Sequence, residues 1–376
     1  MQVGSSPPQS ARSLQLERIL RASIAQHGPM PFADFMERAL YEPGLGYYRA
    51  GPLPWGQGAD YVTAPQVHPA LGQSIAALAV GLDAALDMPA PFSLLEVGSG
   101  NGQLARAVLT TLRDRHPGLW QRLRFVSVER GENAREAQAD LPAPAAGLCV
   151  VATVPEDAGV GLVYANELLD AFPVHRVRQA GNELLESYVD VADDQLVETW
   201  RPPSSRGLLG HLAANAVRLG DGQIGEICLE AERWIGLADS ALSAGGILLV
   251  DYGHSTSTLY GDSRPHGTLV AQQRFVLSDD LLSCPGDRDL TAHVDFGNVQ
   301  RVAEDLGMNW AGRCSLRVFL VGMGATADSA AGGVEERLAL RHLLVSEIAD
   351  SHSVAFMYRD LAGERPAFGR ERLETG

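Results

Sequence analysis

One segment, residues 93–104, constrains the fold of this chain more than any other. An apolar run at residues 93–97 leads into Gly98, Gly100 and Gly102, and the start of a helix follows. Glycine tolerates the positive φ angles of a tight turn and lets the backbone approach a ligand closely. A buried strand that turns so sharply into a helix is typical of an α/β fold with a parallel sheet.

Short apolar runs alternate with helical stretches around this turn. We expect strands at residues 93–97, 125–129, 148–152, 161–166, 247–251 and 316–322, and helices at residues 103–113, 133–141, 226–243 and 295–306. This order predicts a Rossmann-like α/β core, in which a mostly parallel sheet carries helices on both faces.

Two insertions and two terminal segments surround the predicted core. Residues 174–200 alternate in polarity around Gly181-Asn182 and Asp193-Asp194, which predicts inserted antiparallel strands. We divide the chain into four segments: a disordered tail (1–13), an N-terminal segment (14–90), the core (91–323) and a C-terminal segment (324–376). For the N-terminal part we expect helices at 13–25, 31–40 and 70–85 and a loop at 41–69. The core carries insertions near 174–200 and 252–291, and the last segment is a linker followed by a helix at 335–350.

Composition and charge exclude several classes of protein. No apolar run reaches the length of about 18 residues that a membrane span needs, and the formal net charge of −16 would repel nucleic acid phosphates. All 30 basic residues are arginine, which excludes a P-loop lysine and a lysine Schiff base. The four cysteines lack zinc-site spacing, so we predict no metal. We expect a cytoplasmic protein without a nucleic acid or membrane partner, and a homodimer stays open.

The glycine-rich turn predicts a nucleoside ligand. Gly100, Gly102 and Ala105 also fit the dinucleotide pattern G-x-G-x-x-G/A, so the glycines alone leave NAD open. Glu96 ends the strand before the turn, where it would oppose a pyrophosphate but suit a ligand with an amino group, as in S-adenosylmethionine. Glu129 ends the next strand and can accept hydrogen bonds from both ribose hydroxyls. We therefore predict a site for S-adenosylmethionine that includes Glu96, the three glycines and Glu129.

Polar residues at later strand ends are candidates for the methyl-acceptor side. Methyl transfer from a sulfonium is a direct displacement, so the acceptor must be aligned and must lose a proton. Asn166, Glu167 and Asp170 follow the strand at residues 161–166, and we predict catalytic roles for Glu167 and Asp170. A loop cap is the structural alternative. Asp251, which ends the next strand, has the same two interpretations.

A second cluster lies in the segment Thr291-Ala292-His293-Val294-Asp295. His293 and Asp295 could form a pair that accepts a proton, and we include both among the predicted catalytic residues. Asp295 could instead cap the helix that follows it.

Several segments together resemble the MidA-type methyltransferases, a family that includes a mitochondrial complex I assembly factor. The matching segments are residues 41–48 (YEPGLGYY), 58–65 (GADYVTAP), 95–102, 165–174 (ANELLDAFPV), 250–253 and 285–296 (PGDRDLTAHVDF). Each segment is short, but their order and spacing over residues 30–322 are specific.

This resemblance implies a class I methyltransferase core with an N-terminal helical segment over the cofactor site, and S-adenosylmethionine as the cofactor. In the mitochondrial member it implies symmetric dimethylation of an arginine in a complex I subunit. Asn166, Glu167 and Asp170 match the family's A-N-E-x-x-D stretch, and Thr63 matches its T-S-P-E stretch. Thr63 and Asn166 therefore join the predicted cofactor-binding residues.

The chain departs from the family pattern at three places, which indicates a divergent member. T-S-P-E reads Thr63-Ala64-Pro65-Gln66, a Tyr-Arg-x-His run is replaced by residues 272–275 (QQRF), and a Thr-Gln pair by Ser315-Leu316. The methyl acceptor is then either a protein side chain, such as arginine, or a small molecule of secondary metabolism methylated on oxygen or nitrogen. Two further readings are an assembly factor that binds S-adenosylmethionine without catalysis and a nicotinamide-dependent oxidoreductase.

Overall fold

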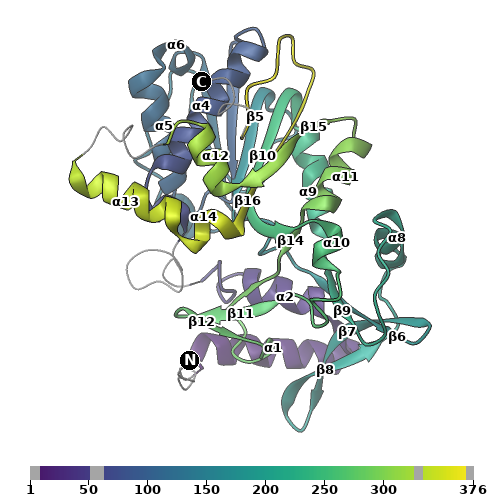
Figure 1. The fold of residues 1–376 in the computed structure, drawn as a ribbon. Coiled ribbons are helices and arrows are strands. Elements are labelled where there is room, and N and C mark those ends of the chain that lie inside the picture. The colour runs from purple at the N-terminus through teal and green to yellow at the C-terminus, as the bar shows by residue number, and fades with distance from the viewer. Residues whose placement is uncertain (1–8, 51–62, 326–332, 370–376) are drawn as a thin grey trace.

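The computed structural model describes residues 9–50, 63–325 and 333–369, and its centre is an eight-stranded sheet (Figure 1). The strands of this sheet are β2 (Phe92–Val97), β3 (Leu123–Val128), β4 (Leu148–Val151), β5 (Gly159–Asn166), β10 (Leu242–His254), β14 (Val294–Asp295), β15 (Asn309–Ser315) and β16 (His352–Arg359). Their order is β15-β16-β10-β5-β2-β3-β4, and β14 pairs with the end of β10.

The direction of the chain through the sheet reverses beside β2. Strand β2 pairs in parallel with β3 on one side and with β5 on the other. The chain runs outward from β2 to β3 and β4, then returns to β5 and continues to β10. In open α/β sheets, ligands bind beyond the carboxyl ends of the strands at such a reversal. The residues that follow β2, β3, β5 and β10 therefore meet at the edge where a ligand is expected.

Helices cover both faces of the sheet, because successive side chains of a strand point to opposite faces. Leu94 of β2 belongs to the core cluster under one group of helices, and Leu95 to the cluster under the other. The first group comprises α4 (Ala70–Ala85), α5 (Gln103–Arg115), α6 (Pro117–Trp120) and α12 (Leu316–Gly322), and the second comprises α9 (Leu229–Ser240) and α11 (Phe296–Asp305). All six residues of β2 are buried, as expected for a central parallel strand.

A second layer of structure lies beside the ligand edge and is drawn in the lower half of Figure 1. Its helices α1 (Ala11–His27) and α2 (Phe32–Tyr41) pack on a sheet of β1 (Met30–Pro31), β6 (His175–Ala180), β7 (Glu183–Ala192), β8 (Gln195–Arg201) and β9 (Ile224–Ile227). A three-stranded sheet of β11 (Val270–Gln273), β12 (Val276–Ser278) and β13 (Asp289–Thr291) completes the layer. The remaining helices are α3 (Ala64–Val67), α7 (Glu132–Glu136), α8 (Arg206–Ala214), α10 (Thr256–Leu259), α13 (Val334–Val345) and α14 (Glu347–Ser351).

The α/β class, the parallel core and the inserted antiparallel strands confirm the sequence-based prediction. The two predicted turns of the first insertion join β6 to β7 and β7 to β8. Gly181 and Asp193 have φ angles of 56° and 47°, the left-handed conformation that such tight turns require. The second insertion, predicted only as a loop region, contains α10 and the three-stranded sheet.

Several element boundaries predicted from the sequence are wrong. Helix α1 begins at Ala11, inside the predicted tail, because the Ser10 side chain accepts a hydrogen bond from the N–H of Ser13. The helix predicted at residues 226–243 is β9 followed by α9, and the helix predicted at 133–141 is the short α7. Residues 316–322, predicted as a strand, form α12, since Ser315 Oγ accepts from the N–H of Val318 at 3.3 Å and caps a helix.

The C-terminal segment differs most from the prediction. The helix predicted at residues 335–350 is divided into α13 and α14, and β15 and β16 were not predicted. Strand β16 lies between β10 and β15 and is antiparallel to both. Residues 354–357 of β16 are fully buried. A continuous apolar run of this kind carries no alternation, so its periodicity does not distinguish a strand from a helix.

No helix in the described part of the chain is both long enough and apolar enough to cross a membrane.

Candidate active site

The turn after β2 has the left-handed backbone conformation that its glycines predicted. Gly98, Gly100 and Gly102 have φ angles of 72°, 54° and 77°. A Cβ atom on Gly98 would lie 2.8 Å from Leu168 Cδ1, and one on Gly102 would lie 2.9 Å from Gln138 Cγ. Side chains at these positions are therefore disfavoured both by backbone strain and by lack of space.

Glu129 connects this turn to the end of β3. Its Oε2 accepts a hydrogen bond from the N–H of Gly100 at 2.9 Å, and its Oε1 accepts from the N–H of Gly131 at 2.7 Å. Burial raises the pKa of Glu129, and the two backbone hydrogen bonds oppose that shift. A carboxylate has about four lone-pair sites, so each oxygen can still accept a hydroxyl. This arrangement fits the predicted contact with the ribose.

A buried polar network that was not predicted holds the turn from below. Ser99 Oγ lies 2.5 Å from Ser127 Oγ, and Ser127 donates to Gln138 Oε1 at 2.5 Å. The amide of Gln138 donates to Ser99 Oγ at 2.9 Å and to the carbonyl of Gly100 at 2.7 Å. Because all three side chains are buried and hydrogen-bonded, they fix the backbone of the turn.

Glu96 lies behind the turn, where it is buried. Its side-chain Oε2 accepts a hydrogen bond from the Tyr164 hydroxyl at 2.7 Å. Burial raises the pKa of Glu96 to about 8, although the hydrogen bond from Tyr164 opposes the shift. With this pKa, Glu96 is mostly protonated at neutral pH, whereas we expected an ionised carboxylate from the sequence.

The N-terminal segment contacts the donor side of the site through Thr63 and its neighbours. Thr63 is the residue before α3, and its N–H donates to Gln66 Oε1 at 2.9 Å, so the amide that replaces the family's glutamate caps this helix. Gln103, at the start of α5, donates to the carbonyl of Pro65 at 3.0 Å. The rest of the GADYV stretch, residues 58–62, lies outside the described residues.

Tyr41 joins the N-terminal segment to both sides of the site. Its hydroxyl donates to the carbonyl of Ala171 at 2.9 Å, which follows β5. The guanidinium of Arg130, which follows β3, lies 4.8 Å from the centre of the Tyr41 ring. Residues near 41 therefore lie across the ends of two core strands.

The turn that follows β5 is held by Asp251, at the end of β10. Its Oδ2 accepts hydrogen bonds from the N–H groups of Leu168, Leu169 and Asp170 at 3.1, 2.9 and 3.4 Å. Asp251 is buried, and burial together with the charges of Asp170 and Glu167 raises its pKa well above the ordinary value. The structure gives Asp251 the capping role that was one of its two sequence interpretations.

Asn166 and Glu167 begin this turn. Glu167 has a φ angle of 49°, which is uncommon for a residue other than glycine. Asn166 Nδ2 donates to Glu167 Oε1 at 3.2 Å, while Asn166 Oδ1 is buried without a hydrogen-bond partner in the described part of the chain. A buried acceptor without a partner is unfavourable, so this oxygen is suited to a donor on a ligand.

Asp170 ends the turn and is 5% exposed. Burial and the charge of Glu167 raise the pKa of Asp170 to about 7, although Tyr252 and His352 oppose the shift. Its Oδ1 is buried, and no hydrogen-bond donor reaches it within the described ranges. Glu167, Asp170 and Asp251 thus gather three carboxyl groups at the ends of β5 and β10.

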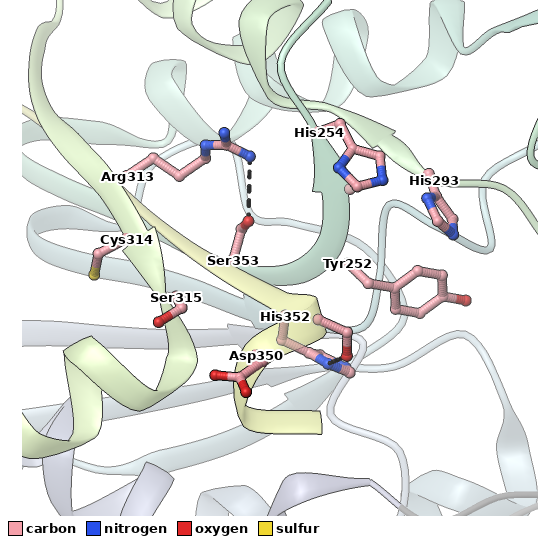
Figure 2. A pocket seen from close by; sticks show the side chains of 11 residues that line it. Tyr252, His254, His293, Arg313, Cys314, Ser315, Asp350, His352 and Ser353 are labelled. Atoms are coloured by element: carbon pink, nitrogen blue, oxygen red, sulfur yellow. Dashed lines mark hydrogen bonds between the residues drawn. The ribbon is translucent and has the colours of Figure 1, made fainter. Parts of the chain in front are cut away.

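A cavity of about 520 Å³ opens beside these carboxyl groups, and Figure 2 shows the side chains around it. It lies at the ends of β10 and β15 and the start of β16, and its lining residues are Tyr252, Gly253, His254, His293, Arg313, Cys314, Ser315, Asp350, Ser351, His352 and Ser353. Arg313 donates to Ser353 Oγ at 3.2 Å across one wall. The lining includes Tyr252 and His352, which interact with Asp170 and Glu167, but it includes neither these carboxyl residues nor the glycine-rich turn.

No hydrogen bond joins His293 to Asp295 in the described residues, and their catalytic role stays a prediction. Asp295 is the N-cap of α11, where its Oδ1 accepts from the N–H of Asn298 at 3.0 Å and from Thr256 Oγ1 at 2.6 Å. His293 lines the cavity, and burial and the nearby His254 and Arg264 lower its pKa to about 4. Within the described residues, neither His293 Nδ1 nor Asp295 Oδ2 has a hydrogen-bond partner.

Comparison with known proteins agrees with this geometry. Residues 74–314 match the family described as "Putative S-adenosyl-L-methionine-dependent methyltransferase". The chain is 31% identical over 328 residues to the protein named "Protein arginine methyltransferase NDUFAF7 homolog, mitochondrial" of Drosophila melanogaster, with 78% of this chain and 70% of that protein covered. It is 27% identical over 350 residues to the Rattus norvegicus protein of that type, with 85% and 77% covered.

A solved structure extends the likeness to the whole chain. A "likely methyl transferase" from Burkholderia thailandensis, bound to S-adenosyl-homocysteine, is 29% identical, has a TM-score of 0.84 and covers 96% of both chains. These findings establish S-adenosylmethionine as the cofactor and methyl transfer as the reaction, so the oxidoreductase and non-catalytic readings are set aside. The chain belongs to the MidA-type family of S-adenosylmethionine-dependent methyltransferases.

Proposed function

We propose that the cofactor lies across the ends of β2, β3 and β5. Its ribose hydroxyls would bind Glu129, and its amino-acid end would lie over the turn of Gly98, Gly100 and Gly102. The buried and unpaired Oδ1 of Asn166 would accept a hydrogen bond from the cofactor's amino group. Thr63 would contact the cofactor from the N-terminal segment, and Glu96 would contact it from behind the turn.

We propose further that the methyl acceptor is an arginine side chain of a protein. The observation that carries this proposal is the cluster of Glu167, Asp170 and Asp251 beside an open cavity. A guanidinium is planar and always charged, and carboxylates bind it through paired hydrogen bonds. Names of similar proteins from Drosophila melanogaster and Danio rerio describe arginine methyltransferases, which supports the same acceptor.

The proposed roles of the carboxyl groups follow from their surroundings. The cofactor would supply a methyl group on a sulfonium. A nitrogen of the acceptor would bond to the methyl carbon as the carbon–sulfur bond breaks, with S-adenosylhomocysteine as the leaving group. Glu167 would orient the guanidinium and draw positive charge away from the reacting nitrogen. Asp170, with a pKa of about 7, can accept the proton that the nitrogen loses. Asp251 would act indirectly, because it holds the turn that carries both residues.

A small-molecule acceptor is the second candidate, and the size of the cavity favours it. Its volume of about 520 Å³ lies within the range of about 300–1,000 Å³ that small-molecule sites show. The altered run at residues 272–275 gives less support than the sequence suggested. It forms the hairpin turn between β11 and β12, with Phe275 64% exposed, and it does not line the cavity.

The test is a methyl-transfer assay that identifies the product. The purified full chain is incubated with S-adenosylmethionine carrying a tritiated methyl group and an extract of cells that lack this protein. Labelled methylarginine in the acid hydrolysate of the protein fraction is the expected result. Label that appears only in the small-molecule fraction would reject the arginine acceptor. The relatives' names place those proteins in mitochondria, while for this chain a cytoplasmic location stays a prediction.

A further inference from the structure

The last strand of the chain brings a histidine into the candidate site. His352 begins β16 and pairs with Tyr252 across β10, at the point where β10 reaches the ligand edge. The two rings meet nearly edge to face, with their centres 5.5 Å apart. Figure 2 shows His352 at the wall of the cavity, beside Tyr252. Its position lies outside residues 74–314, where the chain matches the family.

The contact that matters is with Glu167. His352 Nε2 lies 3.6 Å from Glu167 Oε1, and no hydrogen-bond partner reaches Nε2 within the described part of the chain. The other ring nitrogen, Nδ1, lies 3.2 Å from Ser351 Oγ. His352 is 8% exposed, so the pair is largely shielded from water. A charge interaction at this depth is stronger than one at the surface.

The carboxyl groups around His352 need a counter-charge. Glu167 and Asp170 both raise the pKa of His352, and together they outweigh burial, which would lower it. Asp251 adds a third carboxyl group to the same cluster. Like charges this close disfavour ionisation of one another. Within the described ranges, the basic side chain that pairs with Glu167 is His352, whose Nε2 lies 3.6 Å from Glu167 Oε1.

Other charged groups face the cavity from different elements and are already engaged. Arg313 donates to Ser353, and Asp350 pairs with Arg317 at 2.5 Å. Arg264 contacts His254 Nε2 at 2.8 Å. Of the charged groups at the cavity, His352 is the one that pairs with a member of the carboxyl cluster in the described part of the chain.

We propose that His352, which lines the cavity, is a positioning residue that holds the Glu167 side chain in place until a cationic acceptor replaces it. The second part rests on the proposed function, because it takes the acceptor to be an arginine side chain. When the guanidinium arrives beside Glu167, the imidazolium loses the interaction that favours its charge and releases its proton. His352 then no longer competes with the acceptor for Glu167.

The first test follows the ring of His352 by NMR in the full chain saturated with S-adenosylhomocysteine. Glu167→Gln should lower the pKa of His352 by about one unit, because burial then acts without its opposing charge. Glu186→Gln is the matched control, since Glu186 of β7 pairs with His175 of β6 at 2.7 Å. It should leave the titration of His352 unchanged. An unchanged pKa of His352 in Glu167→Gln would overturn the proposal.

The second test adds acceptor mimics to the same sample. N-acetyl-arginine amide should lower the pKa of His352, whereas the neutral N-acetyl-citrulline amide should not. Equal effects of the two compounds would contradict the exchange of counter-charges. If neither compound acts while Glu167→Gln still lowers the pKa, the positioning role stands and the arginine acceptor is rejected.

The third test measures the pH dependence of labelled methyl transfer into extract protein. His352→Gln should move the acid limb of the rate profile to higher pH by about one unit, because Asp170, the proposed proton acceptor, loses the nearby charge that lowers its pKa. His175→Gln removes a different His–Glu pair, one that does not line the cavity, and should leave that limb in place, even if it lowers stability. An unmoved limb in His352→Gln would contradict the proposal, and if that variant fails to fold, the NMR comparison still decides.

Discussion

Asp251 Oδ2 lies 2.9 Å from the backbone nitrogen of Leu169 and accepts its hydrogen bond. The same oxygen accepts the N–H groups of the residues on either side of Leu169. One side chain at the end of β10 therefore fixes the turn at the end of β5. Through this turn, two neighbouring strands of the sheet determine where the candidate catalytic carboxylates lie.

This relationship predicts that Asp251→Ala lowers the free energy of unfolding by about 2 kcal/mol, because it leaves buried N–H groups without an acceptor. Asp251→Asn keeps an acceptor oxygen and should lose less. Urea denaturation of the variants measures the difference. Asp305→Ala, at an exposed position, should change stability by less than about 0.5 kcal/mol. Equal stability of Asp251→Ala and the wild type would show that the cap is dispensable.

Gly98→Ala should weaken the binding of S-adenosylhomocysteine by about tenfold or more. Its Cβ would lie 2.8 Å from Leu168 Cδ1, and the φ angle of 72° is strained for alanine. Calorimetric titration measures the affinity. Gly210→Ala is the control, since a Cβ there has no atom within 4 Å. Equal affinities for the two variants would contradict the role of the turn.

Glu129→Gln should also reduce affinity for S-adenosylhomocysteine, by about tenfold to a hundredfold. The amide has only one acceptor oxygen, whereas Glu129 already accepts two backbone N–H groups before any hydroxyl binds. Titration calorimetry with the exposed Glu132→Gln as control provides the comparison. Wild-type affinity in Glu129→Gln would mean that the ribose binds elsewhere.

The raised pKa of Asp170 predicts a pH dependence of stability. Its folded-state pKa of about 7 lies above the ordinary value of 3.8. The group therefore favours the folded state at low pH, and this contribution is lost as the pH rises from about 4 through about 7. Asp170→Asn should flatten that part of the profile. Between pH 4 and pH 8, the free energy of unfolding of the variant should therefore fall less than that of the wild type. Denaturation at a series of pH values tests this, and parallel profiles would refute it.

Local patterns were sufficient to predict the glycine-rich turn and the acidic residue that follows the next strand. The three glycines and Glu129 lie within one strand–turn–helix–strand unit, so their positions depend on neighbouring sequence. Asp251 was harder to interpret, because its partners at residues 168–170 are about eighty residues away. A strand end with an acidic residue was the only local signal, and it did not reveal which backbone groups that residue would cap.

His352 could not be predicted in the same way. It reaches Glu167 only because β16 enters the sheet between β10 and β15, and the apolar run of β16 does not reveal its pairing. The network of Ser99, Ser127 and Gln138 depends likewise on the packing of three separate segments. His293 and Asp295 are close in sequence, which suggested that they form a pair. In the structure, Asp295 caps α11 and His293 lines the cavity.

The most direct test of the central claim is the turnover of Glu167→Gln with saturating S-adenosylmethionine, measured as methylarginine formed in extract protein. We expect the variant to bind S-adenosylhomocysteine like the wild type but to lose most turnover, by about a hundredfold or more, because the acceptor is no longer oriented. Glu183→Gln, at an exposed position at the start of β7, serves as the control and should keep normal turnover. Unchanged turnover in Glu167→Gln would contradict the proposed role of Glu167 and place the acceptor away from the ends of β5 and β10.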